Sequence, residues 1–176
     1  QLGKLPTAER RYTDAMKRAR ALGSVRQEAQ AIAGLAWVEQ GKRNFEGADI
    51  LFTRVLNRFN QLDDLRGQAE ATLGQAIVAR RTGNFDDAEE LYVEAVEAFQ
   101  EGDDLLGVAR AVAGRGVVAR QRLQLKRAEQ LLREAIHIAE ELGATPLVME
   151  CRVGLGDIAR IADDHPRARR LYTAYL

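Results

Sequence analysis

The 176-residue chain is poor in several residue types, and each shortage excludes a class of protein. Its one cysteine, Cys151, excludes an internal disulfide framework, and a single free thiol fits a reducing, cytoplasmic location. Two histidines, His137 and His165, leave little material for a metal site or a histidine-based active site. No run approaches the roughly 20 apolar residues of a membrane-spanning helix. Lys and Arg (26) balance Asp and Glu (26), so the bulk charge does not indicate a polyanion-binding domain.

Short catalytic and nucleotide-binding motifs are also missing. The chain lacks the phosphate-binding loop GxxxxGK[ST], the nucleophile elbow GxSxG and the zinc motif HExxH. His165 follows Asp163 and Asp164, but no fourth ligand stands at a suitable spacing, so helix capping is the favoured interpretation. Cys151 would need a histidine and a third group nearby to act as a nucleophile. We therefore expect a protein that is not an enzyme and that holds no metal and no cofactor.

The chain does contain an internal repeat with a period of 40 residues. Its 46% hydrophobic and 30% charged residues are typical of a folded chain, and its length suits one domain or a short repeat array. Shifting the sequence by 40 aligns an alanine column, a column of larger side chains and a glycine column. The columns are Ala8, Ala48, Ala88, Ala128 and Ala168; Tyr12, Phe52, Tyr92, Leu132 and Tyr172; and Gly34, Gly74, Gly114 and Gly154. We expect the small residues to let helices approach closely and the larger ones to fill the space between repeats.

Helical periodicity and turn signals divide the chain into nine expected helices. Apolar residues of 85–99, for example, recur at the i, i+3, i+4, i+7 spacing of one helix face. The expected helices are 6–22, 25–41, 45–61, 65–81, 85–100, 104–121, 125–141, 145–161 and 165–176. Candidate N-caps at helix starts are Asn44, Asn84, Asp63 or Asp64, Asp103 or Asp104, Asp164, and Thr145 ahead of Pro146.

These helices predict an all-α fold, an α-solenoid of antiparallel helix pairs. A single helix pair cannot bury both of its faces, whereas stacked neighbours can. We expect one array over 1–176, with a half repeat at 1–23, full repeats at 24–63, 64–103 and 104–143, and a truncated last repeat at 144–176. The first helix of each pair is called helix A (25–41, 65–81, 104–121 and 145–161), and the other helices are called helix B.

The columns resemble those of the tetratricopeptide repeat, in which a small residue on helix A is followed by an alanine, an aromatic and a second small residue on helix B. The matching residues are Ala76, Ala88, Tyr92 and Ala95, and then Gly116, Ala128, Leu132 and Ala135. The Gly83-Asn84-Phe85 turn is also similar to the family. The resemblance implies a right-handed superhelix with A helices on its concave face, and non-catalytic binding of a protein or peptide. The 40-residue variety is similar to repeat domains of bacterial signalling ATPases and transcriptional regulators, where it serves as a scaffold or sensor.

A partner-binding groove is expected along the A helices. Positions three before, one after and four after the small column Ala36, Ala76, Gly116 and Gly156 should point into it or toward its edges. Candidate groove residues are Trp37, Leu73, Ile77, Arg80, Arg110, Val117, Arg120, Val153, Asp157 and Arg160. They predict a largely apolar floor beside a row of arginines, suited to an amphipathic helix or an extended peptide with acidic groups. The alternative is that the apolar residues are core and the arginines are solvated or paired locally.

Local charge leaves a second function open. Residues 1–23 carry a net charge of +4, and residues 64–103 carry −7. Solenoids normally need capped ends, so the alternative function is structural self-association through uncapped ends. Nucleic-acid binding is not favoured, because only Trp37 is available for base stacking on the expected groove.

Overall fold

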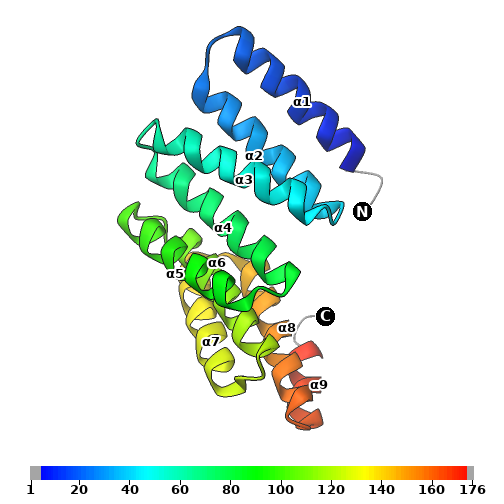
Figure 1. Cartoon of the computed structure of the whole chain (residues 1–176). Helices are drawn as coiled ribbons and strands as arrows, with labels where there is room; N and C mark the ends of the chain where they lie inside the picture. Colours follow the sequence, from blue (N-terminus) through cyan, green and yellow to red (C-terminus); the bar gives the residue numbers. More distant parts are fainter. Residues whose placement is uncertain (1–4, 174–176) are drawn as a thin grey trace. The chain divides into compact units, whose positions relative to one another are not determined.

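The computed structural model describes residues 5–173, which form nine helices and no strand. The helices are α1 (Leu5–Ala21), α2 (Val25–Gly41), α3 (Phe45–Asn60), α4 (Leu65–Thr82), α5 (Phe85–Glu101), α6 (Leu105–Gln121), α7 (Leu125–Glu141), α8 (Thr145–Ile161) and α9 (His165–Thr173). Helices α1 to α4, and likewise α6 to α9, run back and forth as antiparallel neighbours (Figure 1). The predicted all-α class and the helix map are confirmed to within one residue at each described boundary. Residues 174–176 of the last expected helix lie outside the described residues.

Predicted capping side chains stand at four helix starts. Asn44, Asp64, Asp104 and Asp164 each accept a hydrogen bond from the backbone N–H three residues later, at 2.9–3.1 Å. This is the N-cap geometry that satisfies an otherwise unpaired helix donor. The prediction for Thr145 is wrong, because Thr145 is already the first residue of α8. The N-cap of that helix is Ala144, which has no side chain able to accept the bond, and Pro146 lies in the first turn.

All eight turns between the described helices reverse the chain in the same way. One residue of each turn has a positive φ, and the next residue donates its N–H to the carbonyl five residues back at 2.8–3.0 Å. The positive-φ residues are Gly23, Arg43, Asp63, Gly83, Asp103, Leu123, Gly143 and Asp163. This pairing is the Schellman motif that ends a helix without leaving its last carbonyls unsatisfied. Because these residues stand 20 apart, every helix and turn together occupy the same length of chain.

The chain divides into two compact units between Glu94 and Ala95, within α5. In the first unit, α1, α2, α3 and α4 pack consecutively, and α2 also contacts α4. Its core holds two buried clusters on α2, α3 and α4. The first cluster is Ala29, Ile32, Val55, Phe59 and Ala71, and the second is Ala36, Ala48, Phe52 and Val78.

Aromatic rings of α1 and α3 lie directly on glycines of the following helix. A Cβ atom added to Gly74 would stand 2.3 Å from the Phe52 ring, and one added to Gly34 would stand 2.3 Å from the Tyr12 ring. Real Cβ atoms do not approach that closely, so an alanine at either position would force the ring to move. Close packing therefore explains Gly34 and Gly74, and it offsets the cost of roughly 1 kcal/mol for glycine inside a helix.

The second unit repeats this arrangement in α6, α7, α8 and α9, with α6 also contacting α8. Leu132 of α7 lies between Gly116 and Gly154, and the Tyr172 ring of α9 lies on Gly156. In each unit the two A helices contact each other directly, while the described B helices α1 and α3, or α7 and α9, are not among the contacting pairs. The A helices therefore form the more closely spaced face of each unit.

Candidate partner-binding surfaces

The A-helix face of the first unit carries four of the predicted groove residues. Trp37 of α2 is half-buried, with its ring edge-on to Phe52 at 4.9 Å between centroids. Ile77 of α4 is also half-buried, but Leu73 is only 1% exposed and has no surface to offer a partner. Arg80 donates from Nε to the hydroxyl oxygen of Tyr92 at 3.2 Å. Leu73 therefore belongs to the core, as the alternative interpretation of the sequence states.

A cavity of about 490 Å³ lies between α2 and α4 on this face. Its lining residues are Arg26, Gln30, Ala33, Trp37, Phe59, Asp64, Arg66, Gly67 and Glu70. Trp37, Ala33 and Phe59 contribute apolar surface, and the charged residues come from the N-terminal parts of the two helices. Five of the nine lining residues are polar or charged, so a ligand would find apolar contact mainly at Trp37, Ala33 and Phe59.

Sequence reasoning found Trp37 but missed the charged residues of this cavity. The groove prediction used positions near the small column in the middle of helix A, whereas Arg26, Asp64 and Arg66 stand at or next to helix starts. Asp64 carried one signal, its position as an N-cap. Arg26 Nη1 lies 2.6 Å from Asp64 Oδ2, so the pair crosses from α2 to α4 at the end of the cavity.

In the second unit the structure brings three predicted residues together. Arg120 Nη1 donates to Asp157 Oδ2 at 2.8 Å, and Arg160 Nη2 lies 3.9 Å from Asp157 Oδ1. Tyr172 donates its hydroxyl to Asp157 Oδ1 at 2.8 Å, and burial together with this bond raises the pKa of Tyr172. Arg120 is thus occupied by a carboxylate of its own chain. Arg110, Val117 and Val153 are half-buried.

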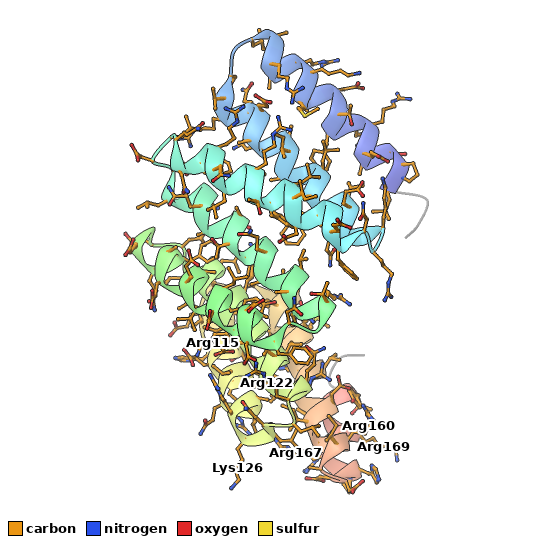
Figure 2. All side chains as sticks on the ribbon, viewed as in Figure 1. Arg115, Arg122, Lys126, Arg160, Arg167 and Arg169 are labelled. Carbon is orange, nitrogen blue, oxygen red and sulfur yellow. The ribbon has the colours of Figure 1, made fainter. Side chains whose placement is uncertain are left out.

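Basic side chains gather where α6 and α8 end and α7 and α9 begin. Figure 2 labels six of them within the second unit, namely Arg115, Arg122, Lys126, Arg160, Arg167 and Arg169. Arg167 Nη2 lies 2.6 Å from Glu129 Oε1, which joins α9 to α7. The alternation of antiparallel helices brings all of these residues except Arg115, which lies in the middle of α6, to one end of the unit, although they are up to 47 positions apart in the sequence.

The residues considered for chemistry lie in unremarkable surroundings. Cys151 is 1% exposed, and burial raises the pKa of its thiol to about 12, so it stays neutral near pH 7. His137 is an exposed helix residue whose Nε2 lies 3.7 Å from Glu141. Within residues 5–173, no three His, Cys, Asp or Glu side chains are placed to hold a metal ion. Over the same range, no helix combines the length and the apolar character needed to cross a bilayer.

The packed antiparallel helix pairs place this chain in the class of α-helical repeat proteins. A family model described as tetratricopeptide repeat matches residues 67–141. The match covers the central helices, and the helices on either side continue the same antiparallel arrangement.

Solved structures support the fold over nearly the whole chain. BtubC (BKLC) from P. vanneervenii is 22% identical with a TM-score of 0.77, covering 96% of this chain and 71% of that one. A putative kinesin light chain with nearly identical TPR-like repeats from P. anserina is 13% identical with a TM-score of 0.63, covering 94% and 92%. Pseudomonas aeruginosa PilF is 15% identical with a TM-score of 0.63, covering 97% and 76%. A comparison with curated proteins gives no match.

Proposed function

We propose that this chain is a protein-interaction module that binds a peptide segment in the cavity between α2 and α4. The observation that carries the proposal is the exposed part of Trp37 beside Ala33 in a cavity of about 490 Å³. Tryptophan is enriched among the residues that dominate binding energy, above all where polar groups surround it. The ligand is a peptide with one bulky apolar side chain seated beside Trp37.

The charged edge of the cavity suits a peptide backbone better than a strongly charged ligand. Arg26 and Asp64 already neutralise each other across α2 and α4 at 2.6 Å. Arg66 and Glu70 add one charge of each sign to the lining. The predicted preference for acidic groups along an arginine row is weakened in the second unit, because Arg120 is paired with Asp157.

Trp37 gives a direct readout because it is the sole tryptophan of the chain. We would select peptides that bind the unaltered chain from a display library of linear 12-residue peptides that lack tryptophan. The soluble Ala33→Phe variant is present during selection as a competitor. Ala33→Phe fills the cavity and adds no tryptophan. The matched control is Asp49→Phe, an exposed residue of α3 that lies outside the cavity lining.

Selected peptides should shift or quench the Trp37 emission of the unaltered chain and of Asp49→Phe. Their affinity for Ala33→Phe should be at least tenfold weaker, while circular dichroism melting shows that the variant is folded. Peptides that bind Ala33→Phe as tightly as the unaltered chain would overturn the proposal, as would a selection that yields no binder.

Self-association through the two ends is the second function expected from the sequence, and it meets an electrostatic obstacle. The exposed residues Arg11 and Arg18 lie on α1, and Arg169 and Arg170 lie on α9. End-to-end stacking of two copies would bring these like charges together. We expect light scattering to give the 19.5 kDa mass of one chain at all concentrations. A mass that rises with concentration would favour the self-association function instead.

A further inference from the structure

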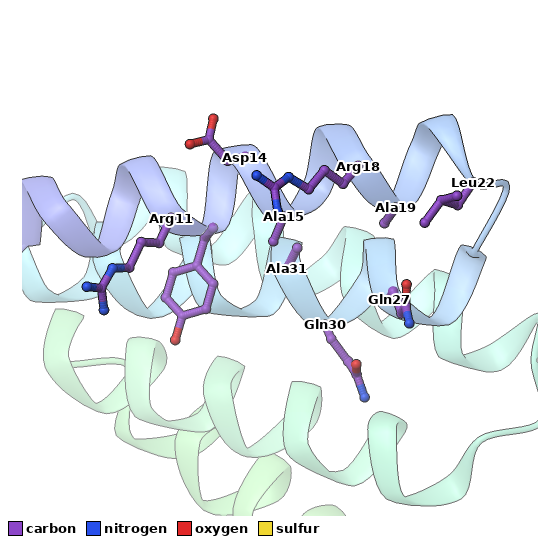
Figure 3. Close-up of a pocket in the computed structure, with 10 residues that line it drawn as sticks. Arg11, Asp14, Ala15, Arg18, Ala19, Leu22, Gln27, Gln30 and Ala31 are labelled. Atoms are coloured by element: carbon purple, nitrogen blue, oxygen red, sulfur yellow. The ribbon is translucent and has the colours of Figure 1, made fainter.

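A second and larger cavity, of about 630 Å³, lies on α1 and α2. Its lining residues are Arg11, Tyr12, Asp14, Ala15, Arg18, Ala19, Leu22, Gln27, Gln30 and Ala31. Figure 3 shows the side chains of Arg11 and Asp14 extending to opposite sides of α1. Large apolar side chains are unusually exposed here, with Leu22 at 78% and Tyr12 at 40%.

The internal repeat indicates which kind of structural element fits this cavity. Five of its lining residues have counterparts exactly one repeat later that are covered in the fold. The counterparts of Arg11, Ala15, Ala19, Leu22 and Ala31 are Leu51, Val55, Phe59, Leu62 and Ala71. All five counterparts pack in one cluster with Ala29 and Ile32 of α2. One repeat later, α2 itself packs in the equivalent position on α3 and α4. The cavity on α1 and α2 therefore has the position and the shape of a site for a helix.

Two side chains of this cavity are smaller than their covered counterparts. Ala15 stands where α3 has Val55, and Ala19 stands where α3 has the ring of Phe59. These exchanges remove the side chains that meet α2 in the covered copy and leave open volume. A helix that fills the cavity therefore needs larger apolar side chains than the Ala29 and Ile32 of α2.

The charge pattern also follows from the covered copy. Glu28 of α2 faces α3, where its Oε1 lies 3.7 Å from Arg54 and where the charge of Arg58 helps to hold its pKa low, after the larger effect of the Arg20 hydrogen bond. Arg18 is the counterpart of Arg58, and Arg11 adds a second cation where α3 has Leu51. A helix lying in the cavity meets these two arginines at its edges and is favoured if it carries carboxylates there.

We propose that the cavity on α1 and α2 docks an amphipathic α-helix of a partner protein, with bulky apolar side chains on one face flanked by carboxylates. This surface is separate from the α2–α4 cavity, although Gln30 lines both. The apolar face lies on the exposed Ala15 and Leu22, and a carboxylate pairs with Arg18. The proposal stands whether or not a peptide binds beside Trp37.

The probe is a synthetic peptide with the sequence of residues 24–42, which spans α2, because α2 is the helix that covers the equivalent place on α3. In the peptide Ala29 is replaced by leucine to fill the added volume, and a side-chain staple on the outer face keeps it helical. Circular dichroism establishes its helicity before binding is measured by fluorescence anisotropy. The chain variants are Ala15→Trp, which fills the cavity, and Ala21→Trp, an exposed residue of the same helix outside the cavity lining.

Binding to the unaltered chain and to Ala21→Trp should agree within twofold, and Ala15→Trp should weaken binding at least tenfold. Arg18→Glu should weaken binding several-fold, and a peptide with Glu28→Lys should restore it. A helical peptide that fails to bind, or that binds Ala15→Trp equally well, would overturn the proposal. A chain of doubled mass in light scattering that becomes a monomer with Ala15→Trp would also overturn it, because the occupant would be a second copy.

Discussion

Asp64 uses its two carboxylate oxygens for two different contacts, one within its own helix and one with Arg26 of α2. Oδ1 accepts the N–H of Gly67 at 3.0 Å and caps α4, while Oδ2 lies 2.6 Å from Arg26 Nη1. The Asp64 side chain is mostly buried, whereas that of Arg26 is more than half exposed. The cap therefore contributes more to stability than the ion pair does, because exposed ion pairs are weak.

Asp64→Ala should lower the free energy of unfolding by about 1–2 kcal/mol, because both contacts are lost. Asp64→Ser keeps a capping oxygen and should lose much less, and Arg26→Ala should lose under about 1 kcal/mol. Urea unfolding followed by circular dichroism measures all three. Equal losses for Arg26→Ala and Asp64→Ala would show that the ion pair, and not the cap, dominates.

The glycines under aromatic rings should differ in how well they accept a methyl group. At Gly74 the added Cβ meets the Phe52 ring, which is 1% exposed and has no room to move. We expect Gly74→Ala to cost at least about 2 kcal/mol through overpacking. At Gly34 the ring belongs to Tyr12, which is 40% exposed and can swing outward, so the roughly 1 kcal/mol gain in helix propensity should make Gly34→Ala nearly neutral. Thermal unfolding of the two variants compares them, and similar losses at both sites would contradict this account.

Leu123 offers a stabilising substitution. It has a φ of 59° in the turn between α6 and α7 and is 69% exposed, so it bears a left-handed conformation without burying its side chain. Such a conformation costs a non-glycine residue about 1–2 kcal/mol, and glycine avoids this cost. Part of the gain is lost again, because glycine loses more conformational entropy on folding. Leu123→Gly should therefore raise the free energy of unfolding by about 0.5–1 kcal/mol. Asp163→Gly should gain less, because aspartate tolerates this conformation better. A loss of stability in Leu123→Gly would show that its side chain contributes packing.

Stability should depend on pH through Glu129. Hydrogen bonds from Arg167 and Arg133 lower its pKa below the ordinary value of 4.5. A carboxyl group with a lowered pKa in the folded state stabilises the fold above pH 4.5 and loses that contribution as the pH falls through the folded-state pKa. Glu129→Gln should therefore unfold at lower urea concentration than the unaltered chain at pH 7, and the difference should shrink toward pH 3. Glu134→Gln, an exposed change on the same helix, is the control. A difference that persists unchanged at pH 3 would mean that the effect is steric.

Much of the fold could be predicted because it depends on short stretches of sequence. Helix boundaries follow from apolar spacing and turn residues, and caps such as Asn44 and Asp104 act on a donor three residues away. The failure at Thr145 is also local in origin. The Schellman turn places its positive-φ residue at Gly143, so the next residue, Ala144, takes the N-cap position. Helix α8 therefore begins at Thr145, one residue earlier than a Thr145 cap would require.

The candidate sites were less predictable, because the availability of a side chain depends on distant neighbours. Leu73 and Ile77 share the repeat pattern of groove residues, yet only Leu73 is fully buried. Arg120 meets its carboxylate 37 residues away, on Asp157 of another helix. The cavity on α1 was not predicted, although its signal was present in the columns: Ala15 and Ala19 are small where Val55 and Phe59 are large.

The sequence by itself determined the repeat, the helices and the N-caps at Asn44, Asp64, Asp104 and Asp164, since each of these depends on residues close together in the chain. Only the tertiary structure decided which surfaces are open to a partner. It paired Arg26 with Asp64, occupied Arg120 with Asp157, and left a cavity lined by α1 and α2. The physical reason is that a repeat sequence fixes which face of a helix carries a side chain. Burial and ion pairing depend instead on the residues of the other helices that pack against that face.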